Sequence, residues 1–434
     1  MKLAVLCTSA ILGMSAPGIA HPEHEFMTGL SAPSPATVLL ITGPELVDSW
    51  KPFVAWKKRL GKPVRILSTT QISERYEAKD LQEKIRRCIR NHTDHLGTRW
   101  IILGGDSERN GRGVVPARDT LHRTQAGEVT KVPTDIYYLS KKDWDSDNDG
   151  IYGEWEDDRE SIDYPDGDVG LGRIPVRTAE DVRAYTNKVI AYESGYPGSD
   201  FATSMAYTSS VPSALDALQT DWDTHLSKVL KGGLVRHLSS GQKNANPFNS
   251  ANWINLINGR ESGKIHMHGG GLHHGWLLED GTVITFSHVA QLRNEGAYPF
   301  ITTTSCFTGE FDRGEDPSIA ESMIRQPKAG AIAIVAPSRA GRHGGINLSM
   351  TRFWEHGLGK KVSAGAAMML VKADLVPEAL KSADLHFSTC GVNLLGDPTL
   401  GLRGTAPRTP SVAGPKKLPA GNLSLVIESD APHS

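Results

Sequence analysis

A histidine and a cysteine each follow a buried apolar run in this chain. His268 closes the segment Lys264–His268 and precedes three glycines, and Cys306 follows the segment Pro299–Thr304 after one serine. The two residues are 306 − 268 = 38 positions apart, which leaves room for one strand, a crossover helix and the next strand. Strands joined in this way often lie side by side in a parallel sheet, and their carboxyl ends then share one crevice. A thiol and an imidazole placed together there are the parts of a nucleophile–base pair.

The residues around this pair suit acyl-transfer chemistry. A thiolate is the reactive form of cysteine, and a histidine can take the thiol proton and later give it to a leaving amine. The turn at 307–309 would leave the Cys306 thiol exposed at the edge of the sheet. The backbone N–H groups of Gly269 and Cys306 are candidate donors to an oxyanion, since such donors act where negative charge develops.

A metal centre is the competing interpretation of the same region. The chain carries a dense histidine cluster, made of His266, His268, His273 and His274, and His-x-His is a known ligand spacing. A metal-dependent hydrolase would also need ligands at other strand ends, and the sequence places no obvious ones there. His266 and His268 point the same way in a strand, so one of the two can line the crevice without binding a metal.

The elements that must position these residues alternate along the chain. Apolar runs expected to form strands are 37–42, 63–67, 100–103, 173–176, 205–208, 235–238, 264–268, 299–304 and 331–335. Helical patterns are expected at 81–90, after the capping box Thr178–Asp181, and at 214–231, 249–258, 287–294 and 317–325. Strands that alternate with helices predict an α/β fold with mainly parallel sheets.

Two tandem α/β halves are expected within the chain. The turn Gly195–Gly198 interrupts the pattern, which then restarts, so we place the halves at 37–198 and 199–403. Residues 404–434 are rich in Pro, Gly and Ser and read as a flexible tail with at most one added strand at 423–427. The sequence shows no repeat of fixed period.

The N-terminus predicts export from the cell. Lys2 precedes the apolar stretch Leu3–Met14, and small residues at 18–20 offer a cleavage point. We therefore expect a signal peptide at 1–20, a polar leader at 21–36 and a secreted or periplasmic mature protein. An ordinary buried N-terminal helix is the alternative. No later stretch reaches the ~18 apolar residues that a membrane span requires.

Composition excludes several classes of partner. Hydrophobic residues make up 39% and charged residues 22% of the chain, with a formal net charge of −2. Nothing in this balance indicates a nucleic acid or an anionic membrane as partner. Removal of Cys7 with the signal peptide would leave Cys88, Cys306 and Cys390, an odd number, so at least one thiol lacks a partner within the chain. The sequence does not decide whether Cys88 and Cys390 form a disulfide with each other.

Several motifs, in order, resemble the gingipain family of secreted cysteine peptidases. They are Leu103–Asp106, Thr134–Tyr138, Asp168–Pro175, Ser305–Phe311 and Asn393–Pro398. The resemblance runs from about Thr37 to Leu402 and implies a caspase-like three-layer fold. It also implies a cysteine endopeptidase that acts on protein or peptide substrates without an organic cofactor, with Cys306 as nucleophile and His268 as base.

The sequence departs from the family pattern at functionally important positions. Met267 stands before the histidine where the family has glycine, and the loop Thr208–Pro212 lacks the acid that orients the histidine in gingipains. Asp216 and Asp221, with Asp223 beside them, are the nearest candidates for an acid that binds basic substrate side chains. The missing acid motivates a second hypothesis, a catalytically silent binding or surface module with the same fold.

An acidic loop predicts a structural calcium site. Asp145–Glu156 fits the pattern D-x-[DN]-x-[DN]-G-x₅-E in full. The expected ligands are the side chains of Asp145, Asp147, Asp149 and Glu156 and the backbone carbonyl of Ile151. Because so many carboxylates in one loop repel one another, a cation would stabilise them. The flanking segments do not read as paired EF-hand helices, and a solvated acidic loop is the alternative.

Overall fold

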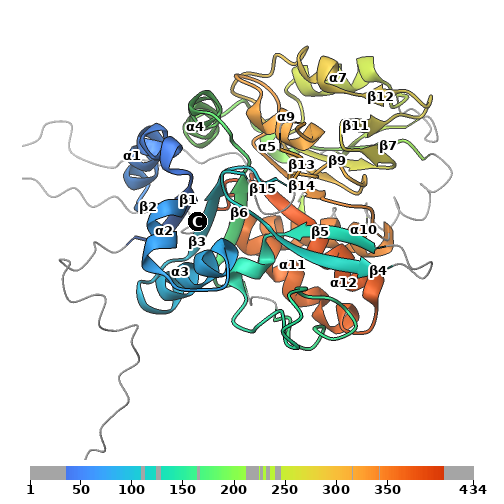
Figure 1. Cartoon of the computed structure of the whole chain (residues 1–434). Helices are drawn as coiled ribbons and strands as arrows, with labels where there is room; N and C mark the ends of the chain where they lie inside the picture. Colours follow the sequence, from blue (N-terminus) through green and yellow to red (C-terminus); the bar gives the residue numbers. More distant parts are fainter. Residues whose placement is uncertain are drawn as a thin grey trace, which may run out of the picture. The chain divides into compact units, whose positions relative to one another are not determined.

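The computed structural model describes the chain from Ala36 onward as one folded unit (Figure 1). The described residues are 36–108, 113–123, 129–163, 167–211, 224, 228–230, 235–239, 246–314, 316–341 and 343–404. Several expected features lie outside them: the signal peptide, nearly all of the leader, most of the helix at 214–231, Asp216, Asp221, Asp223 and the tail from 405. No helix among the described residues is both long and apolar enough to cross a membrane.

A single ten-stranded sheet runs through this unit. Its strand order is β2 (Val64–Ser68), β1 (Val38–Thr42), β3 (Trp100–Gly104), β6 (Gly170–Ile174), β15 (Val392–Gly396), β14 (Ala333–Pro337), β13 (Phe300–Thr303), β9 (Lys264–His268), β7 (Met205–Ser209) and β8 (Val235–Leu238). The strands of both expected halves therefore lie in one sheet, and the mainly parallel α/β architecture expected from the sequence is confirmed.

The two halves of the sheet run in opposite directions. All neighbouring pairs are parallel except β14 and β15, which pair antiparallel from Ala333 opposite Gly396 to Pro337 opposite Val392. β15, although last in the chain, lies between β6 and β14 at the centre of the sheet (Figure 1). The carboxyl ends of β13, β9 and β7 consequently lie together at one edge, where a site can form.

Two smaller sheets were not expected from the sequence. β4 (Arg118–Arg123) and β5 (Val129–Thr134) form an antiparallel hairpin. β10 (Gly271–Leu272), β11 (Gly275–Leu277) and β12 (Val283–Ile284) form a three-stranded sheet within the connection from β9 to β13. Their strands are too short or too polar to stand out as apolar runs.

Helices cover both faces of the main sheet (Figure 1). One group packs together from η2 (Pro44–Trp50), α1 (Lys51–Arg59), α4 (Ala179–Ser194), α8 (Phe286–Val289) and α9 (Ile319–Arg325). A second group joins α10 (His343–Trp354), η6 (Glu355–Gly359), α11 (Ala364–Ala379) and α12 (Ala383–Gly391). The remaining helices are α2 (Thr69–Arg75), α3 (Leu81–His95), η4 (Ile136–Leu139), α5 (Ser199–Thr203) and α7 (Ser250–Asn258).

Local sequence signals account for several of these boundaries. The predicted capping box opens α4, where the Thr178 hydroxyl accepts from the Asp181 N–H and the Asp181 carboxylate accepts from the Thr178 N–H. Val182, on the predicted apolar face, is fully buried. The helix expected at 287–294 is only the single turn α8, which ends at Val289.

Buried ion pairs join motif residues of distant segments. Arg173 in β6 is fully buried, and its guanidinium donates to both Asp135 carboxylate oxygens at 2.8 and 2.6 Å. Asp397, in the closing motif, pairs with Lys57 at 2.6 Å, and both side chains are fully buried. A buried charge is tolerated when it is paired in this way. These motif residues therefore serve the fold and do not form part of the cysteine–histidine crevice.

Candidate active site

His268 and Cys306 follow neighbouring strands, as the sequence predicted. β9 ends at His268, and β13 pairs with β9 in parallel, with Thr302 opposite His266 and Thr303 opposite Met267. Because the two strands are parallel, Cys306, which follows β13, and His268, which ends β9, lie at the same edge of the sheet. The connection between the two strands holds the small sheet β10–β12 and the short helix α8.

The glycine-rich segment after β9 packs against the cysteine turn. A Cβ atom on Gly271 would lie 2.7 Å from the Cys306 carbonyl oxygen and 2.7 Å from the Ser305 Cβ, closer than real atoms approach. At Gly269 the φ angle is +138°, and a Cβ there would overlap the Ser210 hydroxyl. Gly271 is required because its neighbours lie too close for a side chain. Gly269 is required both because a neighbour lies too close and because its φ angle is positive.

A strained turn presents the cysteine. Phe307 has a φ angle of 62°, which is uncommon for a bulky residue and is found preferentially at functional sites. The Thr308 hydroxyl donates to the Ser305 carbonyl at 2.7 Å, and the Glu310 N–H donates to the Phe307 carbonyl at 3.0 Å. Cys306 is partly exposed at this turn.

The other two thiols of the described chain differ from Cys306. None of these three cysteines forms a disulfide in this structure, so Cys88 and Cys390 are not joined to each other. Both lie fully buried. Burial raises the pKa of the Cys88 thiol to about 12, which keeps it protonated and unreactive.

His268 is held by the neighbouring strand. Its side chain is 5% exposed, and its Nδ1 lies 3.1 Å from the Thr304 hydroxyl oxygen. Its backbone carbonyl accepts from the Ser210 N–H at 3.1 Å. The Gly269 N–H, a predicted oxyanion donor, points to the same Thr304 oxygen at 3.4 Å. Thr304 could not be recognised from the sequence, because an orienting residue is typically a carboxylate and the pairing of Thr304 with His268 depends on the strand register.

The acids that follow the cysteine belong to a separate ion-pair network. Glu310 and Asp312 are both buried, and Arg339, which follows β14, pairs with them at 3.3 and 2.6 Å. The segment Thr208–Val211, at the end of β7, carries no acid. Asp216 and Asp221, the predicted substrate-binding acids, lie outside the described residues.

The histidine cluster does not assemble a metal site within the described residues. His266 is fully buried in β9, with Nδ1 2.8 Å from the Thr302 hydroxyl, so it does not line the crevice. Burial, and secondarily the neighbouring His268, hold the pKa of His266 well below its usual range. His273 instead lies 3.1 Å from the Asp316 carboxylate. The only group of three or more His, Cys, Asp or Glu ligand atoms that gathers among the described residues is in the acidic loop.

Comparison with known families decides the assignment of the chain. The family model of peptidase family C25 matches residues 31–403. This chain belongs to peptidase family C25. It is therefore a cysteine-type peptidase, and the resemblance to gingipains that the motifs indicated is confirmed. No match was found among curated proteins.

Solved structures show the same fold. The Arg-specific cysteine proteinase gingipain R (RgpB) is 18% identical, with a TM-score of 0.64 over 87% of this chain and 81% of that one. The complex of Porphyromonas gingivalis RgpB pro- and mature domains gives 18% identity and a TM-score of 0.64 over 86% and 81%. A structure described only as a protease gives 13% identity and a TM-score of 0.65 over 90% and 83%. The caspase-like three-layer fold expected for this C25 chain is thereby confirmed.

The acidic loop of this C25 peptidase gathers three carboxylates. Oxygen atoms of Asp145, Asp147 and Asp149 lie within 4.8 Å of one another. The loop turns at Gly150, whose φ angle is +85° and whose N–H donates to the Asp145 carboxylate at 3.2 Å. The Ile151 N–H donates to Asp149 at 2.7 Å. The turn therefore forms as the calcium-loop pattern requires at these positions.

The fourth predicted carboxylate lies elsewhere. Glu156 is exposed, and neither it nor Glu154 is part of the three-carboxylate group. Glu154 is instead 6% exposed, and its Oε2 has no hydrogen-bond partner. Burial, followed by the charge of Asp149, raises the pKa of Glu154 to about 7. Lys79 donates to Asp145 at 3.1 Å and supplies part of the positive charge that the loop lacks.

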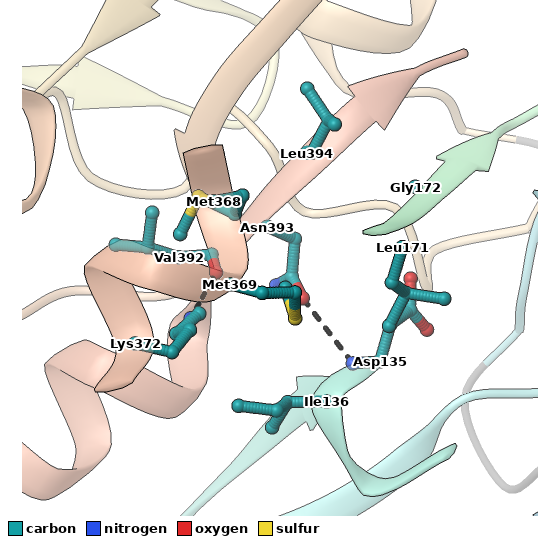
Figure 2. Close-up of a pocket in the computed structure, with 10 residues that line it drawn as sticks. All are labelled: Asp135, Ile136, Leu171, Gly172, Met368, Met369, Lys372, Val392, Asn393 and Leu394. Carbon is teal, nitrogen blue, oxygen red and sulfur yellow. Dashed lines mark hydrogen bonds between the residues drawn. The ribbon is translucent and has the colours of Figure 1, made fainter. Parts of the chain in front are cut away.

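A small cavity lies apart from the cysteine and histidine. It is lined by residues of η4, β6, α11 and β15 and by Asp135, and none of its lining residues belongs to β9 or β13 (Figure 2). Its volume is about 10 Å³, close to the minimum for one water molecule. Lys372 donates to the Val392 carbonyl at 2.5 Å on its wall, and Asn393 accepts from the Asp135 N–H at 3.3 Å. The cavity is too small for a substrate.

Proposed function

We propose that this chain is an exported cysteine endopeptidase in which Cys306 attacks the scissile carbonyl and His268 transfers the proton. The observation that carries the proposal is the packing of the segment after His268 against the Cys306 turn, where Gly271 meets the Cys306 carbonyl. Together with membership of the C25 family, it supports a dyad at the edge of β9 and β13.

The proposed reaction proceeds in two steps. The Cys306 thiolate adds to the carbonyl carbon of the peptide bond, and the tetrahedral oxyanion accepts from backbone N–H groups. His268 then protonates the leaving amine, and a thioester to Cys306 remains. In the second step a water molecule, deprotonated by His268, hydrolyses the thioester and releases the free thiol. Because the Gly269 N–H is directed at the Thr304 hydroxyl, the Cys306 N–H is the donor that this proposal favours.

The test compares thiol variants in a peptide-library assay with reducing agent and calcium. We expect Cys306→Ala and His268→Ala to abolish cleavage and Cys88→Ala to retain it, because Cys88 is fully buried. Iodoacetamide should inactivate the parent and modify Cys306. A Cys306→Ala protein as active as the parent would overturn the dyad. Absence of cleavage by the parent across the library would favour a silent binding module.

Export is proposed from the N-terminal sequence alone. Lys2, the apolar stretch Leu3–Met14 and the small residues at 18–20 support a cleaved signal peptide. The chain should be recovered from the medium or periplasm with a new N-terminus near residue 21. Recovery of the uncleaved chain from the cytoplasm would contradict this proposal.

We also propose that the acidic loop binds calcium as a structural ion. The residues present fit a hard cation, since three carboxylates converge within 4.8 Å. Glu154 lies outside that group, but it is buried, its Oε2 has no hydrogen-bond partner, and the charge of Asp149 acts on it, so it is the proposed fourth carboxylate. Asp145, Asp147, Asp149 and the Ile151 carbonyl would hold the ion, with Glu154 in place of Glu156. Calcium should raise the melting temperature of the parent, and an unchanged melting temperature would refute the site.

A further inference from the structure

Two histidine–threonine pairs cross from β9 to β13. His266 meets the Thr302 hydroxyl at 2.8 Å, and two residues later His268 meets the Thr304 hydroxyl at 3.1 Å. The repetition follows from the parallel register, in which Thr302 lies opposite His266. Residues two apart in a strand share one face, so the second pair continues the first beyond the end of the regular pairing.

We propose that Thr304 is a positioning residue of His268 and takes the orienting role for which the loop Thr208–Pro212 offers no acid. In this arrangement the Thr304 oxygen accepts the hydrogen on Nδ1 of His268. The proton then resides on Nδ1 in the neutral ring, and Nε2 is the atom that exchanges a proton with the thiol and the leaving amine. The inference rests on the proposed function, because it assigns a role only if His268 is the base.

The surroundings of Thr304 hold its hydroxyl in place. Thr304 is fully buried, and its N–H donates to the Met267 carbonyl at 3.0 Å, which fixes its backbone beside β9. A β-branched side chain has few χ1 rotamers, so the hydroxyl direction is restricted. The Gly269 N–H at 3.4 Å is a second donor directed at the same oxygen. One acceptor site of this oxygen faces the Gly269 N–H, and the proposal assigns its second acceptor site to the hydrogen on Nδ1 of His268.

A neutral hydroxyl can perform the orienting part of an acid's role. A partner on one ring nitrogen decides which tautomer forms and how the ring is turned. A hydroxyl lacks the negative charge that would also stabilise the imidazolium. The structure therefore assigns Thr304 an effect on the catalytic step, with little effect on substrate binding.

Thr302 provides a matched control in the same strand. Its hydroxyl accepts from Trp354 Nε1 at 2.9 Å and faces the buried His266, so it touches neither His268 nor Cys306. The first experiment measures kcat and KM of the variants Thr304→Val, Thr304→Ser, Thr302→Val and Thr302→Ser against the parent. Melting temperatures are recorded for each, because either valine variant leaves a buried donor without its acceptor.

We expect Thr304→Val to lower kcat by about 10- to 100-fold with KM nearly unchanged, in the range found for residues that orient another active group. Thr304→Ser should restore most of the activity, because it restores the acceptor. The Thr302 variants should lower the melting temperature without lowering kcat, and Thr302→Ser replaces Thr302→Val if the latter does not fold. A folded Thr304→Val protein with the kcat of the parent would overturn the proposal.

A second measurement does not depend on turnover. Chains labelled with ¹⁵N-histidine in the Cys306→Ala background should show His268 with its proton on Nδ1 when the ring is neutral. The chain has 16 histidines, so His268→Gln identifies the signal by its loss. A proton found on Nε2 of the neutral ring would refute the inference. If Cys306→Ala itself stays active, the proposed function fails. If Cys306→Ala is inactive while Thr304→Val keeps full kcat, only the role of Thr304 fails.

Discussion

Arg339 and Asp312 form a buried two-point ion pair behind the cysteine turn. Nη1 of Arg339 donates to Oδ1 of Asp312 at 2.9 Å, and Nη2 donates to Oδ2 at 2.6 Å. The two side chains are 7% and 3% exposed, and Glu310 lies 3.3 Å from the same guanidinium. The pair links the segment after Cys306 to the residue that follows β14 by two positions, and so it restrains the position of the cysteine turn.

Removal of this arginine should destabilise the protein strongly. Arg339→Ala removes the two-point partner of the buried Asp312 carboxylate and one of the two arginines beside Glu310. Loss of one partner of a buried pair costs about 3–5 kcal/mol. We expect a loss of that size in the free energy of unfolding, measured by denaturant titration, together with lower peptidase activity. The exposed pair of Lys51 and Asp48 is the control, since Lys51→Ala should cost about 1 kcal/mol or less. Equal losses in the two variants would contradict this account.

A methyl group at Gly271 should displace the cysteine turn. The added Cβ would lie 2.7 Å from the Cys306 carbonyl oxygen, and that neighbour is backbone that cannot rotate away. We expect Gly271→Ala to lower kcat at least about 10-fold, because displacements near 1 Å at a reacting group have large effects. Gly401→Ala is the control, because nothing lies within 4 Å of a Cβ there. Retention of the parent kcat by Gly271→Ala would show that the turn does not need this close approach.

The strands that position the proposed dyad could be predicted because they are buried on both faces. Such strands read as continuous apolar runs, and β9 matches its expected bounds at Lys264–His268. β15 was missed as a strand because Asn393 and Gly396 interrupt its apolar run. Its place between β6 and β14 depends on long-range pairing, which no local pattern encodes.

The site was predicted less completely than the strands. The glycines and the cysteine could be recognised from residue type, but Thr304 acts through the register of β13 on β9, which only the folded sheet defines. The acidic loop shows a similar limit. Asp145 to Asp149 follow the calcium-loop spacing, whereas the buried glutamate is Glu154 and not Glu156, because the chain beyond Gly150 does not continue as an EF-hand helix.

The two glutamates should differ in their effect on calcium binding. Neither glutamate belongs to the three-aspartate group, but Glu154 is buried and feels the charge of Asp149, whereas Glu156 is exposed. Glu154→Gln should weaken calcium binding about 10-fold or more, since a ligand charge is lost, while Glu156→Gln should change it little. Calorimetric titration of calcium into each folded variant measures the difference. A larger effect of Glu156→Gln would restore the ligand set expected from the sequence pattern.

Lys372 should make the stability of the protein depend on pH in the alkaline range. Burial lowers the pKa of Lys372 from 10.5 to about 8. Between pH 8 and 10.5 the unfolded chain keeps this proton while the folded chain has lost it, so the free energy of unfolding should rise with pH in that window. The contribution of one group is at most about 1.4 kcal/mol per pH unit.

A variant isolates this contribution from the other groups that titrate there. Buried tyrosines such as Tyr138, whose pKa burial raises, act in the opposite direction above pH 10, so the comparison is made from pH 7.5 to 10. In Lys372→Met the rise with pH should be smaller by the share of this one group, because other buried lysines such as Lys264, whose pKa burial lowers to about 7, still contribute. The variant is less stable throughout because the Thr389 and Val392 carbonyls lose their donor. The free energy of unfolding is measured at each pH by urea titration. The same dependence of the free energy of unfolding on pH in the parent and in Lys372→Met would contradict this prediction. It would mean that the Lys372 ammonium keeps its charge over this pH range.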